Sequence, residues 1–237
     1  AIQAVGGIEV PLYPTTSQEE LLYMIGDSGC KACICSTRDK VEMACKVRSE
    51  TGLQIVICME SLQGDREQDV YHFNEVMDMG RKAFDLAALE KSINTARPED
   101  LVSIIYTSGT TGKQKGAMLT HANWVAAMNQ VTDPTLVRRQ AMDKSMHMLF
   151  LVHLPICHVY GRTCDYHAGG LMQAGILAFE PDFKKLPKTL VELRPNVIIS
   201  IPRFFEKVFD QITHIVSRQS KTVQAVFNWA MRAGGKF

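Results

Sequence analysis

The stretch from Tyr106 to Gly116, YTSGTTGKQKG, constrains this chain more than any other feature of its sequence. Its eleven positions hold four serine or threonine hydroxyls, three glycines and two lysines. Glycine lets a backbone approach an anion closely, hydroxyls and backbone N–H groups donate hydrogen bonds, and lysine adds a point charge. The stretch therefore predicts a phosphate-binding loop. The alternative that stays open is a flexible surface turn.

The residues on either side of this loop predict its place in the fold. An apolar, β-branched run, Leu101–Ile105, precedes it, and a helical pattern follows from about His121 to Val131. We therefore expect a strand, the loop and then a helix. The loop matches neither the GxxxxGK[ST] pattern of P-loop proteins nor the GxGxxG pattern of dinucleotide-binding folds.

The sequence YTSGTTGKQKGAMLTH resembles the signature loop of the adenylate-forming superfamily, which includes acyl-CoA synthetases, luciferases and the adenylation domains of peptide synthetases. In that family the loop holds the β- and γ-phosphates of ATP, and its lysine corresponds to Lys115, which the resemblance makes the catalytic residue. This chain has Gln114 where the family usually has proline. The resemblance implies that ATP is bound by Thr107, Ser108, Gly109, Thr110, Thr111, Gly112 and Lys115.

A second informative stretch is LPICHVYGR, which ends at Arg162. Proline ends a strand, glycine lets a turn come close to a ligand, and α/β folds bind ligands where strands end. The stretch resembles the LPLxHVxG segment of the same family, which implies that His158 is a substrate-binding residue, with Tyr160 and Gly161 as further candidates. A structural histidine with a backbone partner is the alternative. Cys157 and His158 would point to opposite faces of a strand, so we do not expect them to act as a thiol–imidazole pair.

The N-terminal hundred residues alternate between helical and strand patterns. Ser17 and Glu20 form a capping box that opens a helix, and apolar runs near 31–35 and 53–59 are of strand length on either side of a second helical pattern at 39–50. This spacing predicts parallel βαβ units and an α/β fold class. The whole pattern is similar to the parallel-sheet βαβ layers in the N-terminal domain of acyl-CoA synthetases, in incomplete form.

Later segments give weaker patterns. We expect one short helix at 84–93 in the polar stretch 61–100, a glycine-rich helix from Asp165 to Leu177, and helices at 186–193 and from Pro202 onward. The helix that begins at Pro202 has an apolar stripe, which predicts a core-facing surface. The stripe consists of Phe204, Phe205, Val208, Phe209, Ile212, Ile215 and Val216.

The segment RPNVIISIPRFFEKVFDQI also resembles the family, and the match is best with long-chain fatty acyl-CoA synthetases. Family members are more than twice as long, and their magnesium-binding, ribose-binding and C-terminal catalytic-lysine segments have no counterpart in this sequence. We therefore interpret residues 1–237 as a partial N-terminal AMP-binding domain without the C-terminal domain. Residues 1–100 form the first α/β part, and residues 101–237 contain the phosphate loop and the second α/β part.

Composition limits the partners and the location. The net charge of +1 argues against a nucleic-acid partner, and no apolar run reaches the ~18 residues of a membrane-spanning helix. The seven cysteines include a CxxCxC pattern at Cys30, Cys33 and Cys35, but no second pair with ligand spacing follows, so we expect free thiols and no metal ligands in this chain. We expect a cytoplasmic protein, with peripheral membrane contact through a lipid substrate left open.

The resemblance implies a two-step ligase that uses ATP, Mg²⁺ and coenzyme A. A fatty carboxylate would attack the α-phosphorus of ATP to give an acyl-adenylate and pyrophosphate, and the thiol of coenzyme A would then displace AMP. Two alternatives remain: activation of another carboxylic acid, such as an aryl or amino acid, and a non-catalytic nucleotide-binding module. If the chain is a fragment of such a ligase, we expect it to be inactive by itself, because half of the site would lie in the rest of the enzyme.

Overall fold

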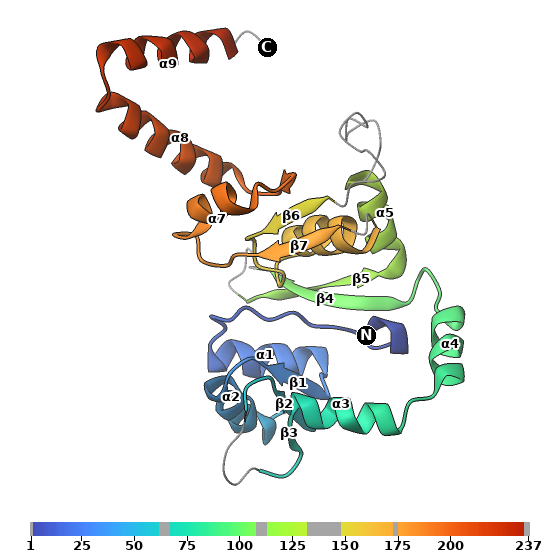
Figure 1. Ribbon diagram of the computed structural model, residues 1–237. Coiled ribbons are helices and arrows are strands. Elements are labelled where there is room, and N and C mark those ends of the chain that lie inside the picture. Colours follow the sequence, from blue (N-terminus) through green and yellow to red (C-terminus); the bar gives the residue numbers. More distant parts are fainter. Residues whose placement is uncertain (1, 62–66, 108–112, 132–147, 173–174, 235–237) are drawn as a thin grey trace. The chain divides into compact units, whose positions relative to one another are not determined.

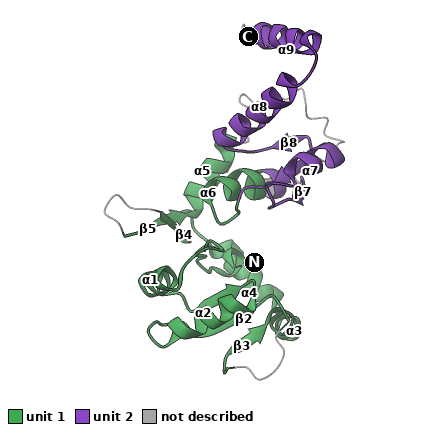
Figure 2. Cartoon of the chain, turned by 90° about the vertical axis from the view of Figure 1, so that its left-hand side faces the viewer, with its two compact units in different colours: residues 1–143, 155–168 green, residues 144–154, 169–237 purple. Residues whose placement is uncertain are grey.

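The computed structural model describes residues 2–61, 67–107, 113–131, 148–172 and 175–234 (Figure 1). The chain divides into two compact units, the first made of residues 1–143 and 155–168 and the second of residues 144–154 and 169–237 (Figure 2). The predicted phosphate loop and the histidine segment LPICHVYGR therefore have most of their residues in the same unit, although some 40 positions of sequence separate them.

The first unit begins with a three-stranded parallel sheet in the order β1-β2-β3. The predicted βαβ arrangement is confirmed, since β1 and β2 are parallel and a helix connects them. The elements up to this sheet's last strand are η1 (Gln3–Val5), α1 (Gln18–Ser28), β1 (Ala32–Cys35), α2 (Arg38–Arg48), β2 (Ile55–Cys58) and β3 (Val70–His72).

Helix α1 starts as the sequence predicts. The Ser17 hydroxyl accepts a hydrogen bond from the backbone N–H of Glu20 at 3.2 Å, and the Glu20 carboxylate accepts one from the N–H of Ser17 at 2.8 Å. Gly29 closes the helix in the left-handed region, with φ of 67°, where a side chain would be strained. The apolar sides of α1, α2 and β2 share one buried core, which includes Leu21, Ile25, Ala44, Val47, Val56 and Cys58.

A hairpin follows this sheet, and it corrects the expectation that the loop leads directly into a helix. Strand β4 (Leu101–Thr107) pairs in antiparallel fashion with a second strand, β5 (Lys115–Thr120). Helix α5 (His121–Val131) begins only after β5, and the Thr120 hydroxyl caps it by accepting from the N–H of Asn123 at 3.3 Å. The sequence of β5 lacks a clear strand pattern, so its conformation depends on pairing with β4.

The polar stretch 61–100 holds more structure than its sequence pattern indicates. It contains β3 and two helices, α3 (Phe73–Lys82) and α4 (Leu86–Thr95). Only α4 was expected, and it begins and ends two residues later than the predicted range 84–93. Helix α3 has a capping box built on His72, whose Nδ1 accepts from the N–H of Asn74 at 3.3 Å. Histidine is an uncommon N-cap residue, so the start of this helix gives no usual sequence signal.

The remaining part of the first unit follows residue 154. It holds the single turn α6 (Val159–Gly161) and the start of the π-helix η3 (Arg162–Met172), up to Ala168. The expected helix from Asp165 to Leu177 therefore starts earlier and ends sooner, because Ile176 and Leu177 belong to strand β7.

The second unit contains another parallel sheet, in the order β7-β6-β8. Gly169 and Gly175 pack against Phe150 so closely that an added Cβ would lie 2.8 and 2.6 Å from its ring, which explains the small residues in this part of the chain. Its elements are β6 (Leu149–Val152), β7 (Ile176–Phe179), α7 (Leu186–Leu193), β8 (Val197–Ile198), α8 (Pro202–Ser217) and α9 (Lys221–Gly234).

Helix α8 corrects the expectation that its apolar stripe lies in a core. Phe204 is buried with Leu151 and Leu186, and Val208 packs against this cluster, but most of the other members of the stripe are exposed. The exposed members are Phe205, Phe209, Ile212 and Ile215. Within the described ranges, none of the helices combines the length and the hydropathy that a bilayer-crossing segment requires.

Candidate functional site

The hairpin β4–β5 brings the two ends of the predicted phosphate loop together. Thr107 is the last residue of β4, Lys115 is the first residue of β5, and the two are partners in the strand register. Both residues are exposed. The middle of the loop, Ser108, Gly109, Thr110, Thr111 and Gly112, lies outside the described residues.

Helix α1 holds both ends of this loop through hydrogen bonds. Before the loop, the Tyr106 hydroxyl donates to Oδ2 of Asp27 at 2.6 Å. After it, the Tyr23 hydroxyl donates to the backbone carbonyl of Gln114 at 2.9 Å, and the Gln114 amide donates to Oε1 of Glu20 at 3.0 Å. Gln114, which stands where the family usually has proline, is therefore fixed by both its backbone and its side chain.

The Tyr106 hydroxyl stays protonated at neutral pH and is therefore a hydrogen-bond donor there. Burial raises the pKa of Tyr106, and the neighbouring Asp27 carboxylate raises it further. The residue is 7% exposed, and its ring stands edge-on to that of Tyr23, with ring centroids 6.1 Å apart. The end of β4 that leads into the loop is thus held by a packed aromatic pair and by one hydrogen bond from the Tyr106 hydroxyl.

His158 caps the turn that follows the LPICHV segment. Its backbone N–H donates to the carbonyl of Pro155 at 3.0 Å, and its Nδ1 accepts from the N–H of Tyr160 at 3.2 Å. An accepting Nδ1 places the proton of the neutral ring on Nε2, which leaves an N–H donor on the other edge of the ring. The histidine lies at the start of a one-turn helix, six residues beyond the end of β6, and not at the strand end that the sequence suggested.

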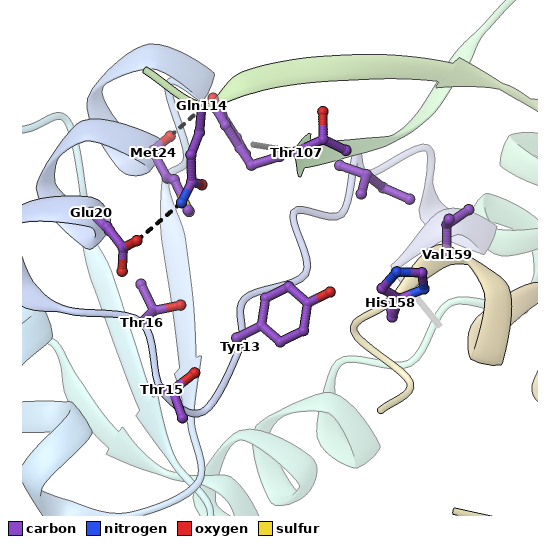
Figure 3. A pocket seen from close by; sticks show the side chains of 11 residues that line it. Tyr13, Thr15, Thr16, Glu20, Met24, Thr107, Gln114, His158 and Val159 are labelled. Atoms are coloured by element: carbon purple, nitrogen blue, oxygen red, sulfur yellow. Dashed lines mark hydrogen bonds between the residues drawn. The ribbon is translucent and has the colours of Figure 1, made fainter. Parts of the chain in front are cut away.

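The predicted residues Thr107 and His158 line one cavity in the first unit, of about 470 Å³ (Figure 3). In Figure 3, Gln114 and Thr107 lie at the top of the cavity, along the hairpin, and His158 and Val159 lie at its right. Lys115, Tyr160 and Gly161 are not among the residues that line it. The structure thus brings two of the described candidate residues together and places the other three nearby in sequence but outside the lining.

A third wall of the cavity, which the sequence did not predict, comes from the loop before α1 and from α1 itself. Hydroxyls dominate this wall, and one carboxylate stands among them. The only signal in the sequence was the run of hydroxyl residues between Pro14 and the capping box, which also fits a simple helix start. This wall consists of Tyr13, Thr15, Thr16, Glu20 and Met24.

Burial favours the protonated form of two side chains in the segment that contains the histidine. Burial raises the pKa of the Cys157 thiol, which disfavours the thiolate that a cysteine nucleophile would need. Burial likewise raises the pKa of Asp165 to about 7. Neither carboxylate oxygen of Asp165 has a hydrogen-bond partner within the described residues, and the side chain is fully buried in η3.

The CxxCxC segment does not form a metal centre in the described part of the chain, where no three His, Cys, Asp or Glu side chains come together as metal ligands. The sulfur atoms of Cys33 and Cys35 lie 3.7 Å apart on one face of β1, as the strand period predicts, and both side chains pack with the core of the first unit. All seven cysteines are free thiols.

Comparison with known proteins identifies the family. The sequence matches the family described as AMP-binding enzyme over residues 1–234, and the chain belongs to that family. Among curated relatives, it is 28% identical over 234 residues to the long-chain-fatty-acid–CoA ligase ACSBG1 of Bos taurus, covering 95% of this chain. It is 30% identical over 212 residues to the long-chain-fatty-acid–CoA ligase FadD15 of Mycobacterium bovis, covering 89% of this chain. The chain spans 31% and 33% of the lengths of these two proteins.

Solved structures share the fold. ATP-bound MatB from Rhodopseudomonas palustris aligns with a TM-score of 0.61 at 23% identity, over 87% of this chain and 37% of that one. The long-chain-fatty-acid–CoA ligase FadD1 from Archaeoglobus fulgidus aligns with a TM-score of 0.57 at 18% identity, over 90% of this chain and 38% of that one. These likenesses confirm the α/β fold with parallel sheets that the sequence predicted.

Proposed function

We propose that the chain is part of a longer ligase that uses ATP to activate a long-chain fatty acid and then transfers the acyl group to coenzyme A. On this proposal residues 1–237 are part of the N-terminal AMP-binding domain, with residues 1–100 and 101–237 as its first and second α/β parts. The observation that carries the proposal is the cavity lined by both Thr107, at the start of the phosphate loop, and His158. A relative at 30% identity and another at 28%, both long-chain-fatty-acid–CoA ligases, support the choice of acid.

The first step joins the acid to the nucleotide. A carboxylate oxygen attacks the α-phosphorus of ATP, the bond to the β-phosphate oxygen breaks, and pyrophosphate leaves with that electron pair. In this proposal Lys115 and the hydroxyls from Thr107 to Thr111 neutralise the departing charge, as a preorganised anion site does. His158 and the residues that follow it position the acid, so that the two reactants meet in a productive geometry.

The second step needs no protein nucleophile. The sulfur of coenzyme A attacks the carbonyl carbon of the acyl-adenylate, the bond to the phosphate oxygen breaks, and AMP leaves with the electron pair while the thiol proton passes to solvent. The raised pKa of Cys157 agrees with this route, because a neutral thiol is a poor competitor for the acyl group.

Mg²⁺ enters this proposal only as the companion of ATP. The described residues form no cluster of three His, Cys, Asp or Glu ligands. The one carboxylate in the cavity, Glu20, already accepts hydrogen bonds from Ser17 and Gln114. These residues do not fit a magnesium site, so no step is assigned to the metal here.

The partners follow from the reaction. The proposed partners are a fatty acid and a nucleotide, with no nucleic acid, and the enzyme would work in the cytoplasm and meet its lipid substrate by peripheral contact with a membrane. The free thiols of all seven cysteines support a reducing compartment.

The test is acid-dependent exchange of labelled pyrophosphate into ATP by the complete protein, across a panel of long-chain, short-chain, aryl and amino acids. We expect the highest kcat/KM with long-chain fatty acids. Highest activity with an aryl or amino acid would show that the reaction is right but that the proposed substrate class is wrong. ATP binding without exchange for any acid would favour the non-catalytic nucleotide-binding module.

A further inference from the structure

Arg162 fixes the turn that carries His158. Its side-chain Nε donates to the backbone carbonyl of Ile156 at 3.0 Å, two residues before the histidine. Its backbone N–H donates to the carbonyl of His158 at 3.0 Å. The same guanidinium donates through its Nη1 to Oε1 of Glu9, in an ion pair. One residue therefore binds the turn on both sides of the histidine and ties it to a segment 153 positions earlier in the chain.

Glu9 is in turn fixed to β4, the strand that ends at the phosphate loop. Its backbone N–H donates to the carbonyl of Val102 at 3.1 Å, and its carbonyl accepts from the N–H of Ile104 at 2.9 Å. The Ser103 hydroxyl, which is fully buried, also donates to the Glu9 carbonyl at 3.2 Å. Glu9 thus acts as an added position on the edge of β4, four residues from Thr107 along the strand.

The ion pair has the burial and the geometry of a rigid connection. The side chains of Arg162 and Glu9 are 13% and 22% exposed, so solvent and salt screen their attraction only weakly. The guanidinium is planar, and its donors point in fixed directions toward the Ile156 carbonyl and the Glu9 carboxylate at the same time. A lysine would present one compact ammonium group in place of this planar fork.

We propose that the Arg162–Glu9 ion pair positions His158 relative to the phosphate loop, by locking the histidine turn onto β4. This inference rests on the proposed function and adds two positioning residues to it. Arg162 and Glu9 contact neither substrate in this proposal, and they act through the placement of His158. The pair thereby holds His158, which positions the acid, in a fixed place relative to the loop that binds the nucleotide.

The same unit contains a matched ion pair outside the cavity. Arg48 donates to the carbonyls of Gln54 at 2.6 Å and Gln68 at 2.7 Å, and it pairs with Asp69 at 3.3 Å. Its side chain is 21% exposed, close to the value for Arg162. Loss of either arginine removes a guanidinium that binds two segments, but only Arg162 holds a cavity residue.

A double-mutant cycle in the complete protein tests the proposal. The variants are Arg162→Met, His158→Ala, the two combined, and Arg48→Met as the control, each compared at equal concentration of folded protein. The readouts are the rate of acid-dependent pyrophosphate exchange and the KM values for ATP and for the acid. Two variants disrupt the ion pair more mildly and are used if Arg162→Met does not fold. They are Glu9→Gln, which removes the charge but keeps the shape, and Arg162→Lys.

We expect Arg162→Met to slow exchange by about 10- to 100-fold, the scale of a 1 Å misplacement, and to leave the KM for ATP within about threefold. In the His158→Ala background the same change should cost less than about threefold, because residues that act through one another are not additive. Glu9→Gln and Arg162→Lys should give intermediate losses, and Arg48→Met should leave the exchange rate unchanged.

Additive losses in the double variant, a silent His158→Ala, or an equal loss in Arg48→Met would overturn this inference while the proposed function stands. A wild-type protein without acid-dependent exchange would overturn the proposed function and this inference with it.

Discussion

The two sides of the cavity are held by different kinds of interaction. On the loop side, hydrogen bonds from the hydroxyl of Tyr106 and the side chain of Gln114 reach the exposed or half-buried carboxylates of α1. On the histidine side, a largely buried guanidinium binds a carboxylate and a backbone carbonyl. The loop side therefore depends on several modest contacts, and the histidine side depends mainly on one charged residue.

The difference shows where an anion can be held. The charge of Arg162 is already compensated by Glu9, so it is not available to a ligand. Lys115 is exposed at the start of β5, and its charge can meet a phosphate at low cost in desolvation. We therefore propose that the phosphates bind on the loop side and that the acid binds on the histidine side.

Replacement of the loop lysine should produce the largest effect. We expect Lys115→Ala in the complete protein to slow acid-dependent pyrophosphate exchange by ~100-fold or more, since a preorganised charge at the departing group is lost. Lys113→Ala is the matched control, because Lys113 is also exposed and lies two residues away. Equal losses of activity in the two variants would mean that the positive charge of the loop matters, but not the position of Lys115.

Loss of the buried phenol should weaken the loop side next. Tyr106→Phe removes the donor to Asp27, and we expect the free energy of unfolding to fall by about 1–1.5 kcal/mol, measured by urea denaturation. Tyr71→Phe, which removes a longer 3.3 Å bond to Asp69 on the other sheet of the unit, should cost less than about 0.5 kcal/mol. Similar losses in the free energy of unfolding for the two variants would show that the Tyr106 contact with α1 stabilises the unit no more than the Tyr71 contact does.

A smaller, kinetic effect should follow from the second tyrosine of α1. Tyr23→Phe frees the carbonyl of Gln114 at the end of the loop, and we expect the KM for ATP to rise by about 2- to 10-fold with little change in kcat. Steady-state kinetics with ATP varied at saturating acid measures this. A fall in kcat with an unchanged KM would show that the contact acts on the reaction and not on nucleotide binding.

A different kind of effect, on stability and not on activity, is the pH dependence that Asp165 causes. Asp165 has a folded-state pKa of about 7, raised by burial from an unfolded value near 4, so the folded chain holds one more proton than the unfolded chain between these values. Its contribution to stability must fall as the pH rises from about 4 to about 7 and stay level above that. Asp165→Asn should flatten this part of the stability profile, measured by urea unfolding at pH 5 and pH 8. An unchanged slope in the variant would contradict the burial of this carboxyl.

Sequence reasoning succeeded where the signal is local. The Ser17–Glu20 capping box, the bounds of α5 and α7, and the parallel βαβ start all follow from patterns that one segment carries by itself. Thr107 and His158, which line one cavity, were chosen because the segments around them resemble motifs of the family.

The features that sequence reasoning missed depend on distant partners. Strand β5 exists because β4 pairs with it, and the Arg162–Glu9 contact joins positions 153 apart. The α8 stripe shows the same limit, since periodicity specifies which face is apolar but not what covers it: Phe204 is 6% exposed and Phe205 is 53% exposed. The wall of Tyr13, Thr15 and Thr16 was hidden because hydroxyls before a helix also serve as ordinary turn residues.

The most direct test of the central claim is a structure of the complete protein with a non-hydrolysable ATP analogue. The account predicts that the terminal phosphates lie within hydrogen-bond distance of the Thr107 hydroxyl and the Lys115 ammonium group, with His158 across the cavity from them. Phosphates bound away from the β4–β5 hairpin, or a loop whose amides are occupied by its own side chains while Lys115 faces away, would contradict it.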